Sequence, residues 1–357
     1  MDLPLPPTGF SNRWNLGLHW GLCSRPECPV RDNLLKCGAC QAVRYCGPAH
    51  QRADWPRHKS SCKLVKASRE KLAQEEAALR ARPGDAFLSE NPFETARGLF
   101  WLMKPTRPYM QSRYELTNAL LNIRTGDAVE DALEHSLGIL HLNPGDNQMI
   151  RGQVPPLYLR LGRDQEAYDF IKWYAAVGSA GGYEWNNPDS PFLNLHDEDV
   201  LEPVDVHIEK LMELSFLACL TNIKIRLLLD LQMLDRESKK AANRNAGFDK
   251  KMEWVREHSL SDVLYRRREL VEMSDWKDLI ATLEDQAKKL FRGVNKRNKH
   301  YWPALRAPEL WTSVVPVACG LGSPQEINLV FRQTWYSWAE CPPALEIVNK
   351  WARMNAV

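Results

Sequence analysis

The order of apolar and polar residues predicts a mainly helical chain with two helix–turn–helix pairs in its first half. The first pair is expected at residues 113–123 and 128–142, and the second at residues 149–161 and 164–173. Glycine-containing turns separate the helices within each pair, and an Asn-Pro-Gly sequence stops the helix that ends at residue 142. The two pairs are therefore expected to form helical hairpins.

Further helices are expected on both sides of these hairpins. Residues 63–82 are charged and rich in helix formers, and the Pro-Gly pair that follows should end this helix. Longer helical stretches are predicted at residues 203–234 and 261–291, with a last helix at 343–354. The polar run at residues 236–251 predicts an exposed linker.

The hairpins follow one another at a spacing of about 34 residues, which resembles tetratricopeptide repeats. Residues 126–147 fit the second half of such a repeat, with Ala132 at the small-residue position and Pro144 at the closing position. The aromatic and glycine positions of the first helix are poorly met. One or two degenerate repeats are one interpretation, and a generic α-helical bundle is the other.

Composition and charge narrow the class of protein. The chain is 44% hydrophobic and 26% charged, ordinary values for a globular protein, and its formal net charge of +2 predicts no strong attraction to nucleic acid. No apolar run reaches the length of a membrane span. The amino terminus has prolines where a secretory signal would have a basic start and a long apolar region.

The nine cysteines are unevenly distributed, which favours a metal site over disulfides. Six of them lie between Cys23 and Cys62, together with two histidines. The remaining three, Cys219, Cys319 and Cys341, lie in apolar surroundings and read as small buried residues. This usage predicts a reducing compartment, either the nucleus or the cytoplasm.

Eight residues of the cysteine-rich segment are candidate zinc ligands. They form four closely spaced pairs: Cys23 and Cys28, Cys37 and Cys40, Cys46 and His50, His58 and Cys62. Since zinc takes four ligands in a tetrahedron, eight ligands fill two sites and leave no position open for water or substrate. The predicted metal is therefore structural, and no catalytic residue is assigned.

The last two ligand pairs have the i,i+4 spacing of one helix face. Asp54 is placed to act as the N-cap of a second short helix, with Pro56 in its first turn. Trp55 is expected to pack between the two sites as the main apolar anchor. Zinc would supply about 10–16 kcal/mol per site, which a segment of this size needs in order to fold.

These residues closely resemble the MYND zinc-finger family. The resemblance implies cross-braced binding of two zinc ions. One ion takes Cys23, Cys28, Cys46 and His50, and the other takes Cys37, Cys40, His58 and Cys62. The family more often has cysteine where this chain has His50. Cross-bracing gives two Cys₃His sites of equal formal charge, whereas sequential pairing would give one Cys₄ and one Cys₂His₂ site.

The resemblance also implies protein binding, since the family usually docks proline-rich peptides, often in transcriptional regulation. Together with helical repeats, the finger indicates an adaptor that is not an enzyme. Candidate contact residues are Gln51, Arg52 and Trp55. Residues 142–174, 298–305 and 335–347 resemble an uncharacterised fungal group of MYND-finger proteins. Nucleic acid and membranes are not expected partners.

The main alternative is an enzyme whose site lies in the helical region, with the finger as an accessory. SET-domain methyltransferases are the best-known enzymes with this finger, but their Asn-His-Ser-Cys-type motif does not occur in the sequence. His207 and Glu209 match only the first half of a zinc deaminase signature. No nucleophile with a base and an orienting residue is visible.

The sequence thus predicts a mainly α-helical protein in four parts. They are an N-terminal tail at residues 1–22, the two-zinc finger at 23–62, an α-helical region with TPR-like hairpins at 63–235 and a C-terminal helical region at 236–357.

Overall fold

The computed structural model describes residues 18–86, 88–178, 181–210, 213–240, 247–312 and 320–354. These residues fall into two compact units. We call the described residues within 17–157 and 182–192 the finger unit, and those within 158–181 and 193–357 the C-terminal unit. The prediction of a small finger followed by a mainly helical fold is confirmed.

The finger unit begins with a small antiparallel sheet. Strand β1 (Leu35–Lys36) pairs with strand β2 (Arg44–Tyr45), with Leu35 opposite Tyr45. Helix α1 (Pro48–Arg80) follows directly, with proline in its first turn, where a missing N–H costs nothing. The sheet and the start of α1 therefore bring the ligand pairs close together.

Helix α1 is one continuous helix, so the predicted break at Asp54 is wrong. Pro56 lies inside the helix rather than at the start of a second one. The Asp54 carboxylate accepts hydrogen bonds from Tyr45 Oη at 2.7 Å and from Arg57 Nε at 2.8 Å, both of which are side-chain donors. Asp54 thus joins the helix to the sheet, and the helix predicted at residues 63–82 is the second half of α1.

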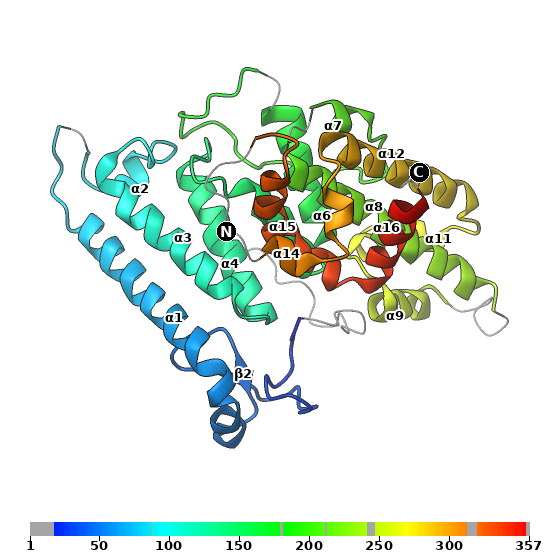
Figure 1. The fold of residues 1–357 in the computed structure, drawn as a ribbon, viewed down its shortest axis with the longest axis horizontal. Coiled ribbons are helices and arrows are strands. Elements are labelled where there is room, and N and C mark those ends of the chain that lie inside the picture. Colours follow the sequence, from blue (N-terminus) through cyan, green and yellow to red (C-terminus); the bar gives the residue numbers. More distant parts are fainter. Residues whose placement is uncertain are drawn as a thin grey trace. The chain divides into compact units, whose positions relative to one another are not determined.

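Helix α1 packs along α3 (Arg107–Leu121), and α3 packs against α4 (Gly126–Leu142), as Figure 1 shows. The α3–α4 hairpin confirms the first predicted pair. Thr125 caps α4, because its hydroxyl accepts a hydrogen bond from the backbone N–H of Ala128 at 3.2 Å. Shorter elements complete this part of the chain: α2 (Pro92–Thr95), η1 (Lys104–Thr106) and η2 (Arg151–Gln153).

The second predicted pair is only partly a hairpin. In place of a helix at 149–161, the chain has the η2 turn and then the short helix α5 (Val154–Arg160). Helix α6 (Asp164–Trp173) has the bounds that were predicted, and a π-helical turn continues it over Tyr174–Gly178. The resemblance to tetratricopeptide repeats stays a prediction.

In the C-terminal unit, the long helix α8 (Leu214–Ser238) lies at the centre and packs most extensively against α12 (Lys277–Arg297). The stretch predicted at 203–234 comprises two helices, α7 (Asp205–Lys210) and α8. The other helices are α9 (Phe248–His258), α10 (Val263–Arg266), α11 (Arg268–Glu272), α13 (Tyr301–Ala304), α14 (Pro308–Thr312), α15 (Pro324–Ala339) and α16 (Pro342–Met354).

The linker predicted at 236–251 is wrong at both ends, because α8 continues to Ser238 and α9 begins at Phe248. Residues 241–246 lie outside the described residues. Cys219 and Cys341 are buried, as predicted, whereas Cys319 lies outside the described residues. Among the described helices, none has the length and apolar character that a membrane crossing needs.

Candidate metal centre

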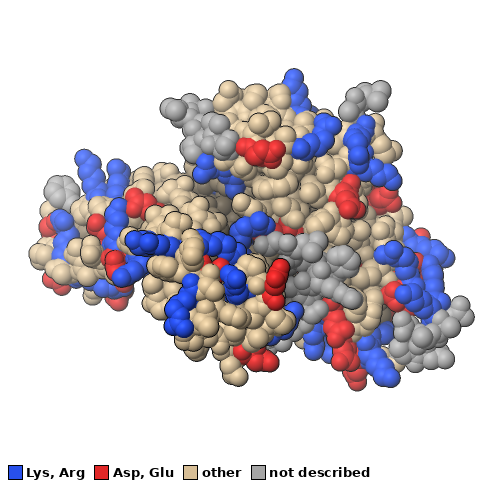
Figure 2. All heavy atoms as spheres, turned by 60° about the horizontal axis from the view of Figure 1, so that its bottom comes forward, with Lys and Arg blue, Asp and Glu red and all other residues tan. Residues whose placement is uncertain are grey.

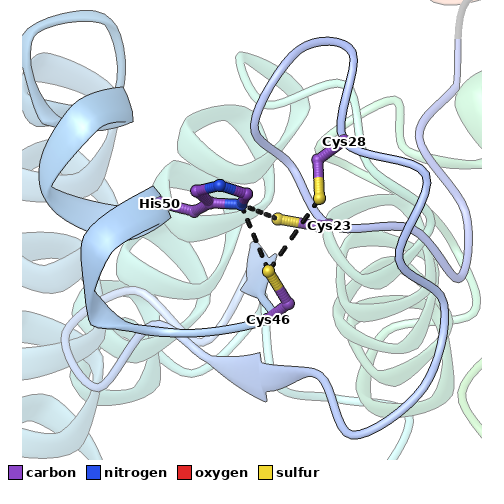
Figure 3. Close-up of side chains that lie close together, drawn as sticks. All are labelled: Cys23, Cys28, Cys46 and His50. Atoms are coloured by element: carbon purple, nitrogen blue, oxygen red, sulfur yellow. Dashed lines mark hydrogen bonds between the residues drawn. The ribbon is translucent and has the colours of Figure 1, made fainter.

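The first cluster, which we call site 1, contains Cys23, Cys28, Cys46 and His50. Figure 3 shows these side chains pointing toward a common centre. His50 Nδ1 lies 3.5 Å from Cys23 Sγ and 3.1 Å from Cys46 Sγ, and Cys28 Sγ lies 3.9 Å from Cys46 Sγ. Two ligands come from the loop before β1, one follows β2, and one lies in the first turn of α1.

The second cluster, site 2, contains Cys37, Cys40, His58 and Cys62. Cys37 Sγ lies 3.8 Å from Cys62 Sγ, and Cys40 Sγ lies 3.4 Å from His58 Nε2. Two of these ligands come from the turn between β1 and β2, and two come from α1. The two sites therefore use different histidine nitrogens, Nδ1 in site 1 and Nε2 in site 2.

Both clusters fit a tetrahedral zinc ion. With a Zn–S bond of about 2.3 Å, two thiolate sulfurs on one ion should lie about 3.8 Å apart. The Sγ–Sγ distance is 3.9 Å between Cys28 and Cys46 in site 1 and 3.8 Å between Cys37 and Cys62 in site 2. Within each cluster all four ligand atoms lie within 4.8 Å of one another. The structure thus brings the eight predicted ligands together in the cross-braced grouping, with room for two zinc ions.

Helix α1 sets the spacing between the sites. It supplies His50 to site 1 and His58 to site 2. Eight residues at about 1.5 Å per residue place these two positions about 12 Å apart along the axis. A single continuous helix, uninterrupted at Pro56, thus sets the distance between the two sites.

Hydrogen bonds shape the turn that carries Cys37 and Cys40. The backbone N–H of Cys37 donates to Val43 O at 2.8 Å, and Gln41 N–H donates to Cys37 O at 2.9 Å. Gln41 has a positive φ of 59°, which lets the chain reverse sharply after Cys40. Gln51 Nε2 lies 3.6 Å from Cys37 Sγ and donates to it from α1. These bonds hold the site 2 thiols in place from two elements.

The thiols differ in their ease of ionisation. Burial opposes ionisation of Cys23, but backbone N–H groups of Cys46 and Arg25 lower its pKa to about 7. Burial and the neighbouring thiols Cys40 and Cys37 raise the pKa of Cys62 to about 12. Since cysteine binds zinc as the thiolate, metal binding must release protons, and acid must weaken it.

Trp55 does not pack between the sites, contrary to the sequence-based expectation. Its side chain is 38% exposed, and its ring packs edge to face with His58, with the ring centroids 6.2 Å apart. The buried aromatic residue of the finger is Tyr45, which also meets His58 edge to face and donates its hydroxyl to Asp54. Tyr45 was missed, although its position directly before Cys46 is a signal for packing beside the metal.

The finger is attached to the α3–α4 hairpin by several polar contacts. Arg44 makes two hydrogen bonds to the Asp127 carboxylate, at 2.7 and 2.8 Å, and Lys36 lies 3.3 Å from the same carboxylate. The Thr125 hydroxyl donates to Ala42 O in the turn of site 2. These partners are 83 residues or more apart in sequence, so no local pattern could have indicated them.

A second attachment lies at the start of α4. His19 pairs with the chain beside Thr125, since His19 N–H donates to Arg124 O at 3.1 Å and Gly126 N–H donates to His19 O at 2.9 Å. A Cβ atom at residue 126 would lie 1.9 Å from the ring of Trp20. Glycine at this position therefore allows the segment before the finger to lie against the helix.

The geometry defines a cross-braced, two-zinc finger with closed sites. In comparison with known proteins, residues 22–62 match the MYND finger family. The predicted resemblance of this segment is thus confirmed, and the two Cys/His clusters are those of a finger that binds two zinc ions.

Curated relatives match short stretches of the chain. Egl nine homolog 1 of Mus musculus is 39% identical over 59 residues, 16% of this chain and 15% of that protein. Histone-lysine N-methyltransferase ASHR1 of Arabidopsis thaliana is 44% identical over 45 residues, 12% of this chain and 9% of that protein. N-lysine methyltransferase SMYD2-A of Xenopus laevis is 30% identical over 78 residues, 18% of each chain.

The chain thus matches less than a fifth of the length of these relatives, and the methyltransferases match it through the finger. No solved structure matches the chain. The resemblance of later segments to a fungal group of MYND-finger proteins stays a prediction.

Proposed function

We propose that the protein is a non-enzymatic adaptor in which zinc holds the finger in shape to dock proline-rich peptides of partner proteins. The observation that carries this proposal is the pair of closed four-ligand clusters in a MYND finger, a module that commonly mediates protein–protein interaction. A closed site has no position for substrate, which favours a role of the metal in shape rather than in reaction.

The docking surface that we propose lies on the first turns of α1. Arg52 and Trp55 are exposed there, and Gln51 is partly exposed beside them. Proline-rich peptides adopt an extended helix with little entropy left to lose, and they dock against exposed aromatic rings. The indole of Trp55, which packs edge to face with His58, offers such a ring. Beside it, the Arg52 guanidinium is a hydrogen-bond donor, as is the N–H of the Gln51 amide that remains besides the bond to Cys37.

Titration of full-length, zinc-loaded protein with proline-rich peptides tests this surface. Trp55→Ala should weaken binding at least tenfold, because truncation of a central aromatic anchor costs about 2 kcal/mol or more. Leu64→Ala is the matched control, since Leu64 is also an exposed apolar residue of α1. Equal binding by both variants would refute the docking surface.

Partner capture tests the dependence on metal. A pull-down with wild-type protein should retain partners that a Cys37→Ala variant loses. If the same partners are retained by both, the adaptor proposal fails.

We further propose that the protein acts inside the cell, in the nucleus or the cytoplasm, and that a role in transcriptional regulation follows if its partners prove to be nuclear.

Nucleic acid is not part of this proposal. Acidic side chains lie among the basic ones on the face shown in Figure 2, in keeping with a net charge of only +2. A mixed surface gives little of the counterion release that drives nucleic-acid binding. Measurable affinity for DNA or RNA at low salt would contradict this part of the proposal.

The alternative, an enzyme with its site in the helical region, finds its best support in one polar cluster of the C-terminal unit. Tyr168 Oη donates to Glu202, Lys172 Nζ donates to the other Glu202 oxygen at 2.9 Å, and His207 Nε2 lies 3.3 Å from the carboxylate. These bonds also fasten the segment before α7 to α6, which is a structural role.

Glu202→Gln separates the two roles. A structural carboxylate should lower the melting temperature when it is replaced by an amide, because Lys172 loses the opposite charge and one of the two acceptor oxygens is replaced by a donor. A catalytic carboxylate commonly costs stability, so its neutralisation should leave the melting temperature unchanged or raise it. We expect the decrease.

A further inference from the structure

The two metal sites differ in how far they are shielded from water. In site 2, all four ligands are buried: Cys37, Cys40, His58 and Cys62 are 2%, 0%, 6% and 1% exposed. In site 1 only Cys23 is buried, and Cys28, Cys46 and His50 are partly exposed. A chelator that must touch a ligand or the ion meets site 1 first.

The sites also differ in what holds them. The loop that carries Cys23 and Cys28 is bonded to other residues of the finger: Ser24 N–H donates to Arg44 O at 2.7 Å, and Arg57 donates to Ser24 O at 2.7 Å. Both contacts lie within the finger, and the attachments to the α3–α4 hairpin lie outside the loop, at His19 before it and at Lys36 and Arg44 after it. The loop around Cys23 and Cys28 can therefore open while these attachments persist. Such a loop belongs to the low-stability end of a protein.

Site 2 is connected to the helical hairpin through Arg69. This residue of α1 donates from Nε to the backbone carbonyl of Cys40 at 3.1 Å, and its Nη2 forms an ion pair with Asp131 of α4. The guanidinium is thus placed between a zinc ligand and α4. Since a guanidinium donates in a fixed planar fork, it fixes the carbonyl of Cys40 and the carboxylate relative to each other.

We propose that the two sites have separate roles, with site 2 as the permanent joint between finger and hairpin and site 1 as the exchangeable outer site. In this arrangement Arg69 is a positioning residue for site 2, although it is not a ligand. Loss of the outer ion frees the loop around Cys23 and Cys28. The inner ion leaves only when α1, α3 and α4 separate locally. This inference is independent of which partner the finger binds.

Zinc release from the full-length, zinc-loaded protein into excess 4-(2-pyridylazo)resorcinol tests the proposal. We expect two phases of one ion each, with the second at least tenfold slower. Hydrogen exchange measured after the fast phase should show exposure of residues 22–33, with α3 and α4 still protected. A single phase, or loss of protection in α3 and α4 during the fast phase, would overturn the proposal.

Arg69→Met tests the positioning role, because methionine keeps the apolar stem and removes the donors. The slow phase should accelerate about tenfold, as expected for loss of a charge-assisted hydrogen bond, while the fast phase is unchanged. Lys66→Met is the control, since the same change on α1 removes only an exposed pair with Glu70. Equal acceleration of both phases, or of neither, would refute the role of Arg69. If Arg69→Met does not fold, Asp131→Asn provides the same comparison with a smaller effect.

Discussion

The finger and the apolar core around helix α8 hold ionisable groups away from water by different means. In the finger, thiols and imidazoles gather around positions for metal ions, and few large apolar side chains are buried. In the C-terminal unit, α8 lies within a large apolar core that nevertheless contains Lys224, Arg226 and Asp230, all buried. The finger depends on an added ion, whereas the partners of the buried charged residues of α8 are other residues of the chain.

The buried charges of α8 are closely matched by partners. Arg226 Nε lies 2.9 Å from Asp164 of α6, and one guanidinium nitrogen donates to Leu159 O at 2.9 Å. Asp230 accepts hydrogen bonds from Leu260 N–H at 2.7 Å and from the Ser261 hydroxyl at 2.9 Å. Each charge therefore connects α8 to a neighbouring segment. It follows that metal removal should affect the finger unit, and charge removal the C-terminal unit.

The largest effect is expected from Cys37→Ala or from a strong chelator. Loss of a structural zinc site removes about 10–16 kcal/mol, more than a segment of this size can replace. The finger and the adjoining part of α1 should lose protection in hydrogen exchange, while α8 stays protected. Cys219→Ala is the control, because Cys219 is a buried thiol outside both sites. It should retain full zinc content, and α8 unfolding in step with the finger would contradict the contrast between the two regions.

Arg226→Met should be the next largest effect. It leaves the Asp164 carboxylate, whose pKa burial already raises, without its nearest cation. Breaking a buried pair in this way costs about 3–5 kcal/mol, which urea unfolding would measure. The double variant Arg226→Met with Asp164→Leu should recover much of that stability, because neither charge remains. No recovery in the double variant would argue against the pair.

Lys224 gives the C-terminal unit a pH dependence. Burial lowers the pKa of Lys224 from 10.5 to about 7, although Nζ donates to Glu202 O at 3.1 Å and to Gln286 at 2.6 Å. Between these pH values the unfolded chain holds more protons than the folded one. The free energy of unfolding should therefore rise with pH from about 7 to 10.5, by at most about 1.4 kcal/mol per unit. Lys224→Met should lack this rise, and an identical slope in both proteins would exclude Lys224 as its source.

The smallest effect is expected at the surface contact between finger and hairpin. Asp127→Asn removes the charge that Arg44 and Lys36 share, and these side chains are partly exposed. Exposed pairs contribute about 0.2–1 kcal/mol, so thermal unfolding should shift only slightly and zinc content should stay unchanged. A loss of bound zinc in this variant would mean that the surface pair, rather than the ligands, maintains the sites.

The ligand set of the finger could be predicted from sequence because its chemistry is local. Cysteine and histidine at such short spacings are typical of a zinc site, and the family resemblance supplied the cross-braced pairing. The course of α1 could not be predicted in the same way. Pro56 and Asp54 carry the local signature of a helix start, but side-chain bonds to Tyr45 and Arg57 override it.

Helix type and position were predictable where turn residues mark both ends, as for α4 and α6. The contacts that organise these helices were not. Arg69 and Asp131 are 62 residues apart, and Arg160 and Glu340, a buried pair of the C-terminal unit, are 180 residues apart. Such pairs depend on tertiary packing, which leaves no periodic trace in the sequence.

The central claim, that both metal sites are closed, is tested most directly by the zinc content of the purified protein combined with X-ray absorption at the zinc edge. Two zinc ions per chain are expected, with an average first shell of three sulfurs and one nitrogen. One ion per chain, or an oxygen ligand from solvent on either ion, would contradict the claim.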